Sequence, residues 1–383
     1  MNPDVVIVGG GIAGTSCAYF LARAGLKPHL VEKGPLGSGA SRAGMSHVVS
    51  WEEPEIHLEL GRHSNVLYEE LAQTLPLDIE YRHTGSIAIV EEPEKMADMR
   101  QLVQRLQAWG LTCQMLSSQD MRELEPNISA NVAGGAFFNE DSQVNPLYAT
   151  RALAQAAVQM GAVIEPFNEV TGFEFSPGRQ AVTAVLTQKG RIATGAVVIA
   201  AGAWSGLVGK LAALDVPVFP RKGILIITVP VPRDFLHTKI ILAAGYMDSV
   251  KSGSGSGISV AANVQQMANG NLLLGSSRQM VGFDTSVDPK VVATMIQRNL
   301  RFFPGLASIS ALRTWAGFRP YTPDLLPIIS PVEHLGGMFL ACGHEGIGIT
   351  EGPITGKLIS QLVTGQKTDI AIEQLAFSRF ASH

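Results

Sequence analysis

Cysteine is scarce in this chain of 383 residues, which contains Cys17, Cys113 and Cys342 alone. An odd number with no Cys-x-x-Cys pair argues against a disulfide framework and against a zinc or iron–sulfur site. The sequence also lacks the His-Glu-x-x-His motif of zinc proteases and the Gly-x-Ser-x-Gly turn of serine hydrolases. We therefore expect no bound metal and no hydrolase chemistry of these kinds.

Charge of either sign is also limited. The 29 lysines and arginines are opposed by 33 acidic residues, so there is no basic footprint for nucleic acid. No basic leader precedes the first apolar run, and we expect no signal peptide. Residues 195–214 approach the length of a membrane span, but four glycines and Lys210 favour a buried strand followed by a helix. We expect a cytoplasmic protein without a membrane span.

The first 32 residues have the pattern of a β-α-β unit. Apolar runs at residues 4–8 and 28–32 flank a stretch with helical periodicity at 12–24. Gly9-Gly10-Gly11-Ile12-Ala13-Gly14 fits Gly-x-Gly-x-x-Gly, whose glycines allow a tight turn, close approach to a pyrophosphate and close helix packing. The helix N-terminus favours phosphate, and Glu32 can accept hydrogen bonds from a ribose. The pattern predicts dinucleotide binding over a glycine turn without a ligand, but it does not separate FAD from NAD.

The remaining pattern predicts an α/β fold (α+β overall), with a Rossmann-like nucleotide domain interrupted by a β-rich domain. Residues 146–160 read as a helix, and 162–165 and 196–201 as buried strands. The predicted nucleotide domain comprises residues 1–84, 141–216 and 316–383, and the predicted substrate domain comprises 85–140 and 217–315.

Three further segments carry a more specific signal: residues 32–45 (EKGPLGSGASRAGM), residues 197–205 (VVIAAGAWS), and residues 315–324 (WAGFRPYTPD) continued by 343–348 (GHEGIG). Together they resemble the D-amino-acid oxidase superfamily of FAD enzymes, in the branch with glycine oxidase and sarcosine oxidase. The resemblance runs the whole length in the same order. Within that branch the chain is most similar to the catalytic beta subunits of D-hydroxyproline, L-proline and opine dehydrogenases and of hydrogen cyanide synthase.

The resemblance implies a fold of the D-amino-acid oxidase type and oxidation of the carbon–nitrogen bond of a small amino acid or amine. Ser41 and Arg42 could donate to phosphate, although a surface loop is the alternative there. The full set predicted to bind FAD is Gly9, Gly11, Ile12, Ala13, Gly14, Glu32, Lys33, Ser41, Arg42, Ala43, Gly44, Met45, Val170, Ala201, Gly202, Trp204, Arg319, Gly343, His344, Gly346, Ile347 and Gly348.

Four residues are candidates for contact with the substrate. The guanidinium of Arg319 offers a planar fork that matches a carboxylate, with a structural ion pair as the alternative. His344 is either a general base or a hydrogen-bond donor within its loop. Tyr246 and His47 are expected near the substrate and the flavin, with core or surface roles open. A helix predicted from about residue 352 to 363 could stabilise negative charge on the reduced flavin.

Two departures from sarcosine oxidases bear on the reaction. No flavin-linking cysteine occurs at residues 318–321, so we expect noncovalent FAD. A leucine in the strand at 271–275 replaces their oxygen-activating lysine, which favours electron transfer to a partner subunit carrying a second flavin or an iron–sulfur cluster. The alternatives are a self-sufficient oxidase that releases hydrogen peroxide, a non-catalytic flavin-binding subunit and a NAD-dependent dehydrogenase.

Overall fold

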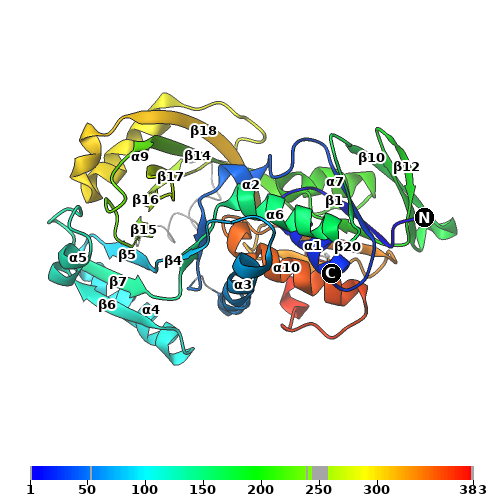
Figure 1. The fold of residues 1–383 in the computed structure, drawn as a ribbon, viewed down its shortest axis with the longest axis horizontal. Coiled ribbons are helices and arrows are strands. Elements are labelled where there is room, and N and C mark those ends of the chain that lie inside the picture. The colour runs from blue at the N-terminus through cyan, green and yellow to red at the C-terminus, as the bar shows by residue number, and fades with distance from the viewer. Residues whose placement is uncertain (1, 52–53, 239, 244–257, 381–383) are drawn as a thin grey trace.

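The computed structural model describes residues 2–51, 54–238, 240–243 and 258–380. The chain forms two lobes that lie side by side, each built around its own large sheet (Figure 1). Both chain termini lie in one lobe, which contains a six-stranded sheet, and the other lobe contains an eight-stranded sheet.

The six-stranded sheet is parallel except for one edge strand, and its order is β19-β20-β13-β1-β2-β9. Its strands are β1 (Val5–Val8), β2 (Pro28–Glu32), β9 (Val163–Pro166), β13 (Val197–Ile199), β19 (Ile328–Pro331) and β20 (Met338–Cys342). Val5 and Ile7 face a helical layer, whereas Val6 and Val8 face a three-stranded sheet on the other side. This burial on both faces explains the uninterrupted apolar runs of the sequence.

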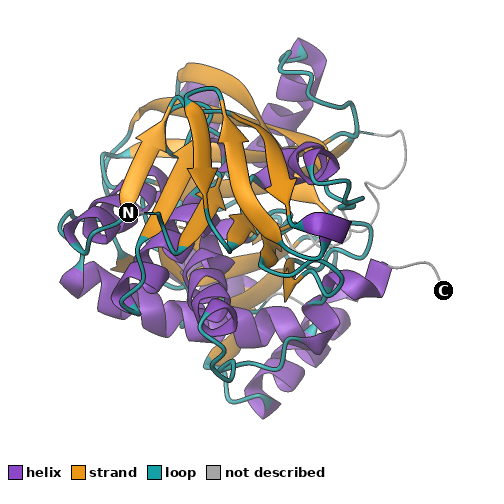
Figure 2. Cartoon of the chain, turned by 90° about the vertical axis from the view of Figure 1, so that its right-hand side faces the viewer, coloured by secondary structure: helices purple, strands orange, loops and turns teal. Residues whose placement is uncertain are grey.

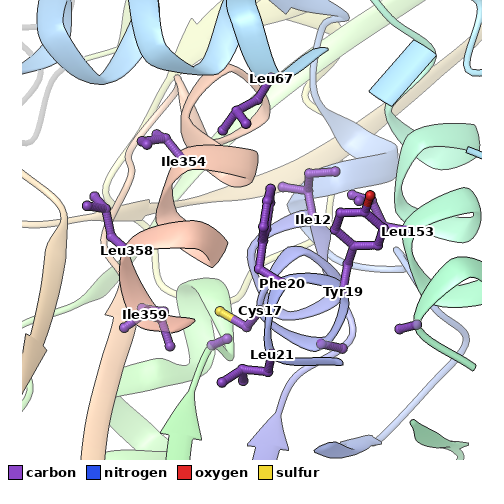
Figure 3. Close-up of a cluster of buried hydrophobic side chains, with 14 of the residues drawn as sticks. Ile12, Cys17, Tyr19, Phe20, Leu21, Leu67, Leu153, Ile354, Leu358 and Ile359 are labelled. Carbon is purple, nitrogen blue, oxygen red and sulfur yellow. The ribbon is translucent and has the colours of Figure 1, made fainter. Parts of the chain in front are cut away.

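The helical layer consists of α1 (Ile12–Arg23), α3 (Glu55–Thr74), α6 (Pro146–Gln159) and α10 (Gly348–Val363). Helix α1 lies between α6 and α10, and Phe20, Leu21 and Ile354 are among the buried side chains that join them (Figure 3). Viewed from the end of this lobe, most helices lie below and beside the strands (Figure 2).

Two glycines allow α10 to approach α1 closely. A β-carbon at Gly356 would lie 2.4 Å from the backbone of Ser16, and one at Gly352 would lie 2.8 Å from Ile12. The helix begins at Gly348, four residues earlier than the sequence predicts. Packing against α1 offsets the low helix propensity of its glycines, which periodicity alone does not show. The first turns of α1 and α10 are therefore brought together.

The eight-stranded sheet has the order β18-β14-β17-β16-β15-β5-β7-β6, and all of its pairs are antiparallel except β15–β5. Its strands are β5 (Ser86–Val90), β6 (Cys113–Ser117), β7 (Gly134–Phe138), β14 (Phe219–Pro230), β15 (Ile240–Ala243), β16 (Ser259–Gln266), β17 (Asn271–Arg278) and β18 (Ala311–Tyr321). Helices α4 (Met96–Ala108) and α5 (Ser118–Leu124) pack near β6 and β7, and α9 (Pro289–Phe302) packs on β16 and β17.

Shorter elements complete the chain. They are the three-stranded sheet of β10 (Val170–Phe175), β11 (Val182–Thr187) and β12 (Gly190–Ala193), the sheet of β3 (His47–Val48), β8 (Ser142–Gln143) and β4 (Arg82–His83), and helices α2 (Ala40–Ala43) and α7 (Ser205–Leu211). The predicted domain boundary at residue 316 falls inside β18, which runs on without a break to Tyr321. The predicted boundaries stay a prediction.

Candidate functional site

A cavity of about 860 Å³ is lined by residues of both large sheets. It runs from the glycine turn after β1, past α2, to the inner strands of the eight-stranded sheet and the loop before α10. A volume of this order is typical of pockets that enclose cofactors and substrates.

The glycine turn forms one end of the cavity. Gly9 has a φ of +116°, and a β-carbon there would lie 2.4 Å from the carbonyl oxygen of Ala200. The backbone N–H of Ile12, in the first turn of α1, donates to Ser41 Oγ at 3.0 Å. Helix α2 is thereby tied to the start of α1, and the cavity wall presents small residues and backbone there.

Glu32 follows this turn at the end of β2. Its carboxylate accepts hydrogen bonds from the backbone N–H groups of Gly10 at 2.7 Å and Gly34 at 2.8 Å. The ammonium of neighbouring Lys33 lies 4.0 Å from the centre of the Trp204 ring, which also lines the cavity. The acid is thus held at a fixed place on the cavity wall.

The loop between β20 and α10 closes another side. Gly343 and Glu345 have positive φ values of 83° and 44°, which turn the chain sharply into the helix. The imidazole of His344 lines the cavity, and its Nε2 lies 2.8 Å from Thr355 Oγ1 of α10. Burial lowers the pKa of His344, so its ring is neutral near pH 7.

Glu345 is a buried carboxylate among arginines. Its Oε1 accepts a hydrogen bond from Nη1 of Arg221 at 3.1 Å and lies 3.8 Å from Nε of Arg278. Burial opposes ionisation of Glu345, but the positive charges of Arg278, Arg319 and Arg221 outweigh it and hold its pKa below the usual value. The carboxylate is therefore ionised at neutral pH.

Arg319 extends from β18 across the neighbouring strand. Its Nη1 donates to the carbonyl oxygen of Ser277 on β17 at 3.0 Å, and the guanidinium lies over Gly223 of β14. The side chain lines the cavity and is partly exposed to it. The geometry brings a guanidinium to the same cavity as the loop before α10.

His47 begins β3 and lines the cavity near Met45. Burial lowers the pKa of its imidazole to about 3, so the ring is neutral over the whole range in which most enzymes work. The Oγ1 atom of Thr350, in the first turn of α10, donates to the backbone carbonyl of His47. This bond ties β3 to the helix.

The cavity gathers nearly all the predicted site residues within the described part of the chain. Those that line it are Gly9, Gly11, Ile12, Ala13, Glu32, Lys33, Ser41, Arg42, Ala43, Gly44, Met45, His47, Val170, Ala201, Gly202, Trp204, Arg319, His344, Gly346, Ile347 and Gly348. Gly14 and Gly343 lie outside the wall. A β-carbon at Gly14 would meet Gly9 O at 1.9 Å, and one at Gly343 would meet Thr322 at 2.6 Å, so both serve packing. Tyr246 lies outside the described residues.

Several polar residues of the wall were not predicted from the sequence. Among them are Asn168, Asn263, Ser276 and Thr285, each of which lies in a stretch without a recognisable motif. Glu345 could have been singled out, because it lies inside the Gly343–Gly348 segment. Strand alternation alone does not tell which polar residue faces a cavity.

Two kinds of feature are absent from the described residues. Their His, Cys, Asp and Glu side chains form no group of three or more that could hold a metal ion. None of their helices is both long enough and apolar enough to cross a bilayer.

Comparison with known proteins gives consistent matches over the full chain. A family model described as FAD dependent oxidoreductase matches residues 4–362. The hydrogen cyanide synthase subunit HcnC of Pseudomonas aeruginosa is 29% identical, over 98% of this chain and 96% of its own length. The crystal structure of glycine oxidase from Geobacillus kaustophilus is similar with a TM-score of 0.89 at 27% identity, covering 100% of both chains. That of L-proline dehydrogenase from P. horikoshii has a TM-score of 0.91 at 24% identity, covering 99% and 98%.

Proposed function

The chain belongs to the family of FAD-dependent oxidoreductases, and from that premise we propose that it oxidises the carbon–nitrogen bond of a small amino acid. The observation that carries the proposal is the guanidinium of Arg319, which lines the same cavity as the loop before α10. A cationic planar fork suits the carboxylate that every amino acid offers.

The residues that line the cavity have the chemistry needed to bind FAD. Gly9 allows the tight turn against Ala200, Gly11 lets the backbone approach a pyrophosphate, and the start of α1 offers positive potential. Glu32 lies at the end of β2, where an adenosine ribose is bound in dinucleotide folds. Ser38 to Met45 and the loop before α10 would hold the flavin end. When bound, FAD supplies the hydride acceptor.

The side chains of the chain itself orient and protect the substrate. Arg319 binds the carboxylate and so places the α-carbon. The first turn of α10 directs backbone N–H groups and positive potential toward the cavity, which favours negative charge there. His344 is neutral and held by Thr355, and we assign it a hydrogen-bonding role in the loop rather than that of an obligatory base. The imine product then hydrolyses.

The names of the relatives support the choice of substrate class. Glycine oxidase and L-proline dehydrogenase are named for small amino acids, and HcnC is named as a subunit of hydrogen cyanide synthase. We therefore propose glycine, proline, hydroxyproline, sarcosine or an opine as the range within which the substrate lies. FAD is held noncovalently in this proposal.

The route of the electrons is a further part of the proposal. Lys33 is the one lysine among the described residues of the cavity wall, and it lies against Trp204 rather than beside β17. Without an ammonium near the substrate, developing superoxide has less stabilisation. We therefore favour a dehydrogenase that passes electrons to a partner subunit with a second flavin or an iron–sulfur cluster. An oxidase that releases hydrogen peroxide is the alternative.

Anaerobic reduction of the bound flavin tests the proposal. The purified protein should be yellow, which a NAD-dependent dehydrogenase would not be, and one of these amino acids should bleach its absorbance near 450 nm. Slow recovery in air would support a protein acceptor, and rapid recovery with hydrogen peroxide would support the oxidase. If no amino acid bleaches the flavin, with or without a co-purified partner, the chain is a non-catalytic flavin-binding subunit.

A further inference from the structure

Helices α3 and α10 share a buried pair of ionisable side chains that the proposed reaction does not use. Nδ1 of His57 on α3 lies 2.6 Å from Oε1 of Glu351 on α10, and the two side chains are 4% and 1% exposed. The contact is as short as a hydrogen bond between an imidazolium and a carboxylate. A buried charge that loses its partner is strongly destabilising, so an ionised Glu351 needs the imidazolium beside it.

The pair lies in an apolar layer. Leu67 of α3 and Ile354 of α10 are buried in the same layer and lie near each other (Figure 3). Well-packed apolar residues in place of a buried ion pair often leave a protein equally stable or make it more stable. Stability of the fold alone therefore gives no reason for two ionisable groups at this place.

The carboxylate lies directly behind the cavity wall. Glu351 is the fourth residue of α10, and the three residues before it, Gly348, Ile349 and Thr350, line the cavity. The backbone N–H of Glu351 donates to the carbonyl oxygen of Ile347 at 3.0 Å, which closes the first turn of the helix. The charge of Glu351 is thus held against the turn whose N–H groups are directed toward the cavity.

Further bonds between α3 and α10 hold the pair in place. The hydroxyl of Tyr68 donates to the carbonyl oxygen of Ile349 at 2.6 Å, and Oγ of Ser64 accepts from the backbone N–H of Ile354 at 3.3 Å. Charges that are fixed before a reaction stabilise or destabilise a bound group more strongly than mobile solvent does. The pair is therefore part of a rigid support beneath the first turn of α10.

The field of the pair reaches the cavity wall at His344. Burial has the largest effect on His344 and lowers its pKa, the carboxylate of Glu351 raises it, and the charge of His57 lowers it by a smaller amount than Glu351 raises it. The interior of a protein screens such charges less than water does. Since the carboxylate has the larger effect at His344, the pair presents its negative end to the wall.

We propose that the pair of His57 and Glu351 sets the reduction potential of the flavin bound at the first turn of α10. This inference rests on the proposed function, which puts the flavin end of FAD beside this turn. The carboxylate opposes the positive potential of the helix N-terminus and lowers the reduction potential, whereas the imidazolium limits that effect. A lower potential makes the reduced flavin a stronger reductant toward its electron acceptor.

Equilibrium reduction of the FAD-loaded protein beside a reference dye tests the inference without any substrate. Glu351→Gln keeps the shape of the side chain and removes its negative charge. The ratio of reduced to oxidised flavin at a fixed potential should rise about tenfold, which for two electrons is about 30 mV. His57→Gln leaves the carboxylate without the cation and should lower that ratio by a similar factor. The double variant should lie between the two single variants.

Tyr68→Phe is the matched control. It removes the hydrogen bond from α3 to the carbonyl oxygen of Ile349 without changing a charge. This variant should melt at a lower temperature and keep the flavin potential of the wild type. A shift as large as that of the charge variants would show that the shape of the turn, and not the charge behind it, sets the potential, and the inference would be overturned.

The charge of His57 can also be measured in the wild-type protein. Nitrogen NMR of labelled histidine near pH 8 should show at least one of the nine imidazoles protonated on both nitrogens, because a buried carboxylate beside an imidazole favours its charged form. The spectrum of His57→Gln should lack this signal. If every imidazole is neutral, there is no ion pair and the inference is wrong, whether or not the variants bind FAD.

The remaining outcomes separate this inference from the proposed function. If neither charge variant shifts the flavin potential, the pair only joins the two helices, and the inference fails while the proposed function stands. If the potentials shift as expected but no amino acid bleaches the flavin, the pair acts on a flavin that does not oxidise amino acids. In that case the proposed function fails and the inference stands.

Discussion

The guanidinium of Arg319 occupies the space that a side chain at Gly223 would need. A β-carbon at Gly223 would lie 2.2 Å from Nη1 of Arg319 and 2.9 Å from the carbonyl oxygen of Ser277. Gly223 and Arg319 come from paired strands almost 100 residues apart in the sequence, and the glycine permits the arginine to lie flat across β14. The position of the proposed carboxylate anchor therefore depends on the absence of a side chain.

Gly223→Ala should displace the anchor without changing its chemistry. We expect kcat/KM for the amino acid to fall about 10–100-fold, because misplacement of a bound substrate by about an ångström costs that much. FAD content, read from the ratio of flavin to protein absorbance, should stay near that of the wild type. A variant with unchanged kcat/KM would show that the guanidinium does not need this position.

Arg319→Leu should weaken binding of the substrate carboxylate and leave binding of the rest of the substrate largely unchanged. KM should rise about 10–100-fold for an amino acid but much less for its amide, since hydrogen bonds to a charged group are worth about 1.5–3 kcal/mol. Arg313→Leu, on the same strand but exposed, is the matched control and should leave both values unchanged. Equal effects of Arg319→Leu on acid and amide would exclude the anchor role.

The segment around Phe283 should control how fast FAD leaves. The Phe283 ring stacks on Trp204 at 5.1 Å, Asp284 pairs with Nζ of Lys222 at 2.7 Å, and Thr285 lines the cavity. Phe283→Ala and Asp284→Asn should each speed FAD dissociation about 3–10-fold, because each removes a contact that holds this segment beside the cavity. Glu70→Gln, which breaks the exposed pair with Arg23, should not change that rate.

The Asp284 pair also has a defined pH range. Hydrogen bonds from Lys222 and Ser286 hold the pKa of Asp284 well below its usual value of about 4. The pair therefore adds stability above about pH 4, and this contribution disappears only as the pH falls through the lowered pKa. Melting temperatures of wild type and Asp284→Asn should differ by a constant amount above pH 5 and converge in stronger acid. Convergence already at pH 6 would contradict the assignment.

His47 should make the protein less stable in mild acid. Its pKa is about 3 in the folded protein, whereas an unfolded histidine takes up a proton near pH 6.5. The unfolded state is therefore favoured progressively as the pH falls from about 6.5 toward 3. In urea unfolding, the free energy of unfolding of His47→Gln should fall less over this range than that of the wild type. The two slopes should differ by at most about 1.4 kcal/mol per pH unit. Parallel curves for the two proteins would show that the imidazole is accessible to protons.

The β-α-β unit illustrates what the sequence could predict. The glycine turn, the apolar runs and Glu32 are close in sequence, and local geometry determines how they meet, so the structure places them together as expected. The loop before α10 was predicted as part of the same site because its motif resembles a known family. The early start of α10 at Gly348 was missed, because it depends on packing against Ser16 and Ile12.

The part of the cavity wall that the eight-stranded sheet forms could not be predicted in the same way. Asn263 and Ser276 lie on adjacent strands. The side of the sheet that each side chain faces depends on the strand register and on a shift in the pairing of β16 with β17. Gly223 lies within a strand, and from the sequence alone a glycine there indicates only a residue that weakens the strand. That these residues lie near Arg319 or line the cavity can be recognised only when the strand order β18-β14-β17-β16 is known.

The strand order of the six-stranded sheet also determines how late in synthesis this sheet can be completed. β1 pairs with β13, which follows it by almost 190 residues, and β13 in turn pairs with β20 near residue 340. A nascent chain therefore holds an incomplete sheet, with apolar strands open to chaperones and to aggregation, until β20 has been translated. Helix α10, which covers α1, is translated later still. The cavity, which the first turns of α1 and α10 both line, can accordingly be completed only after α10 has been translated.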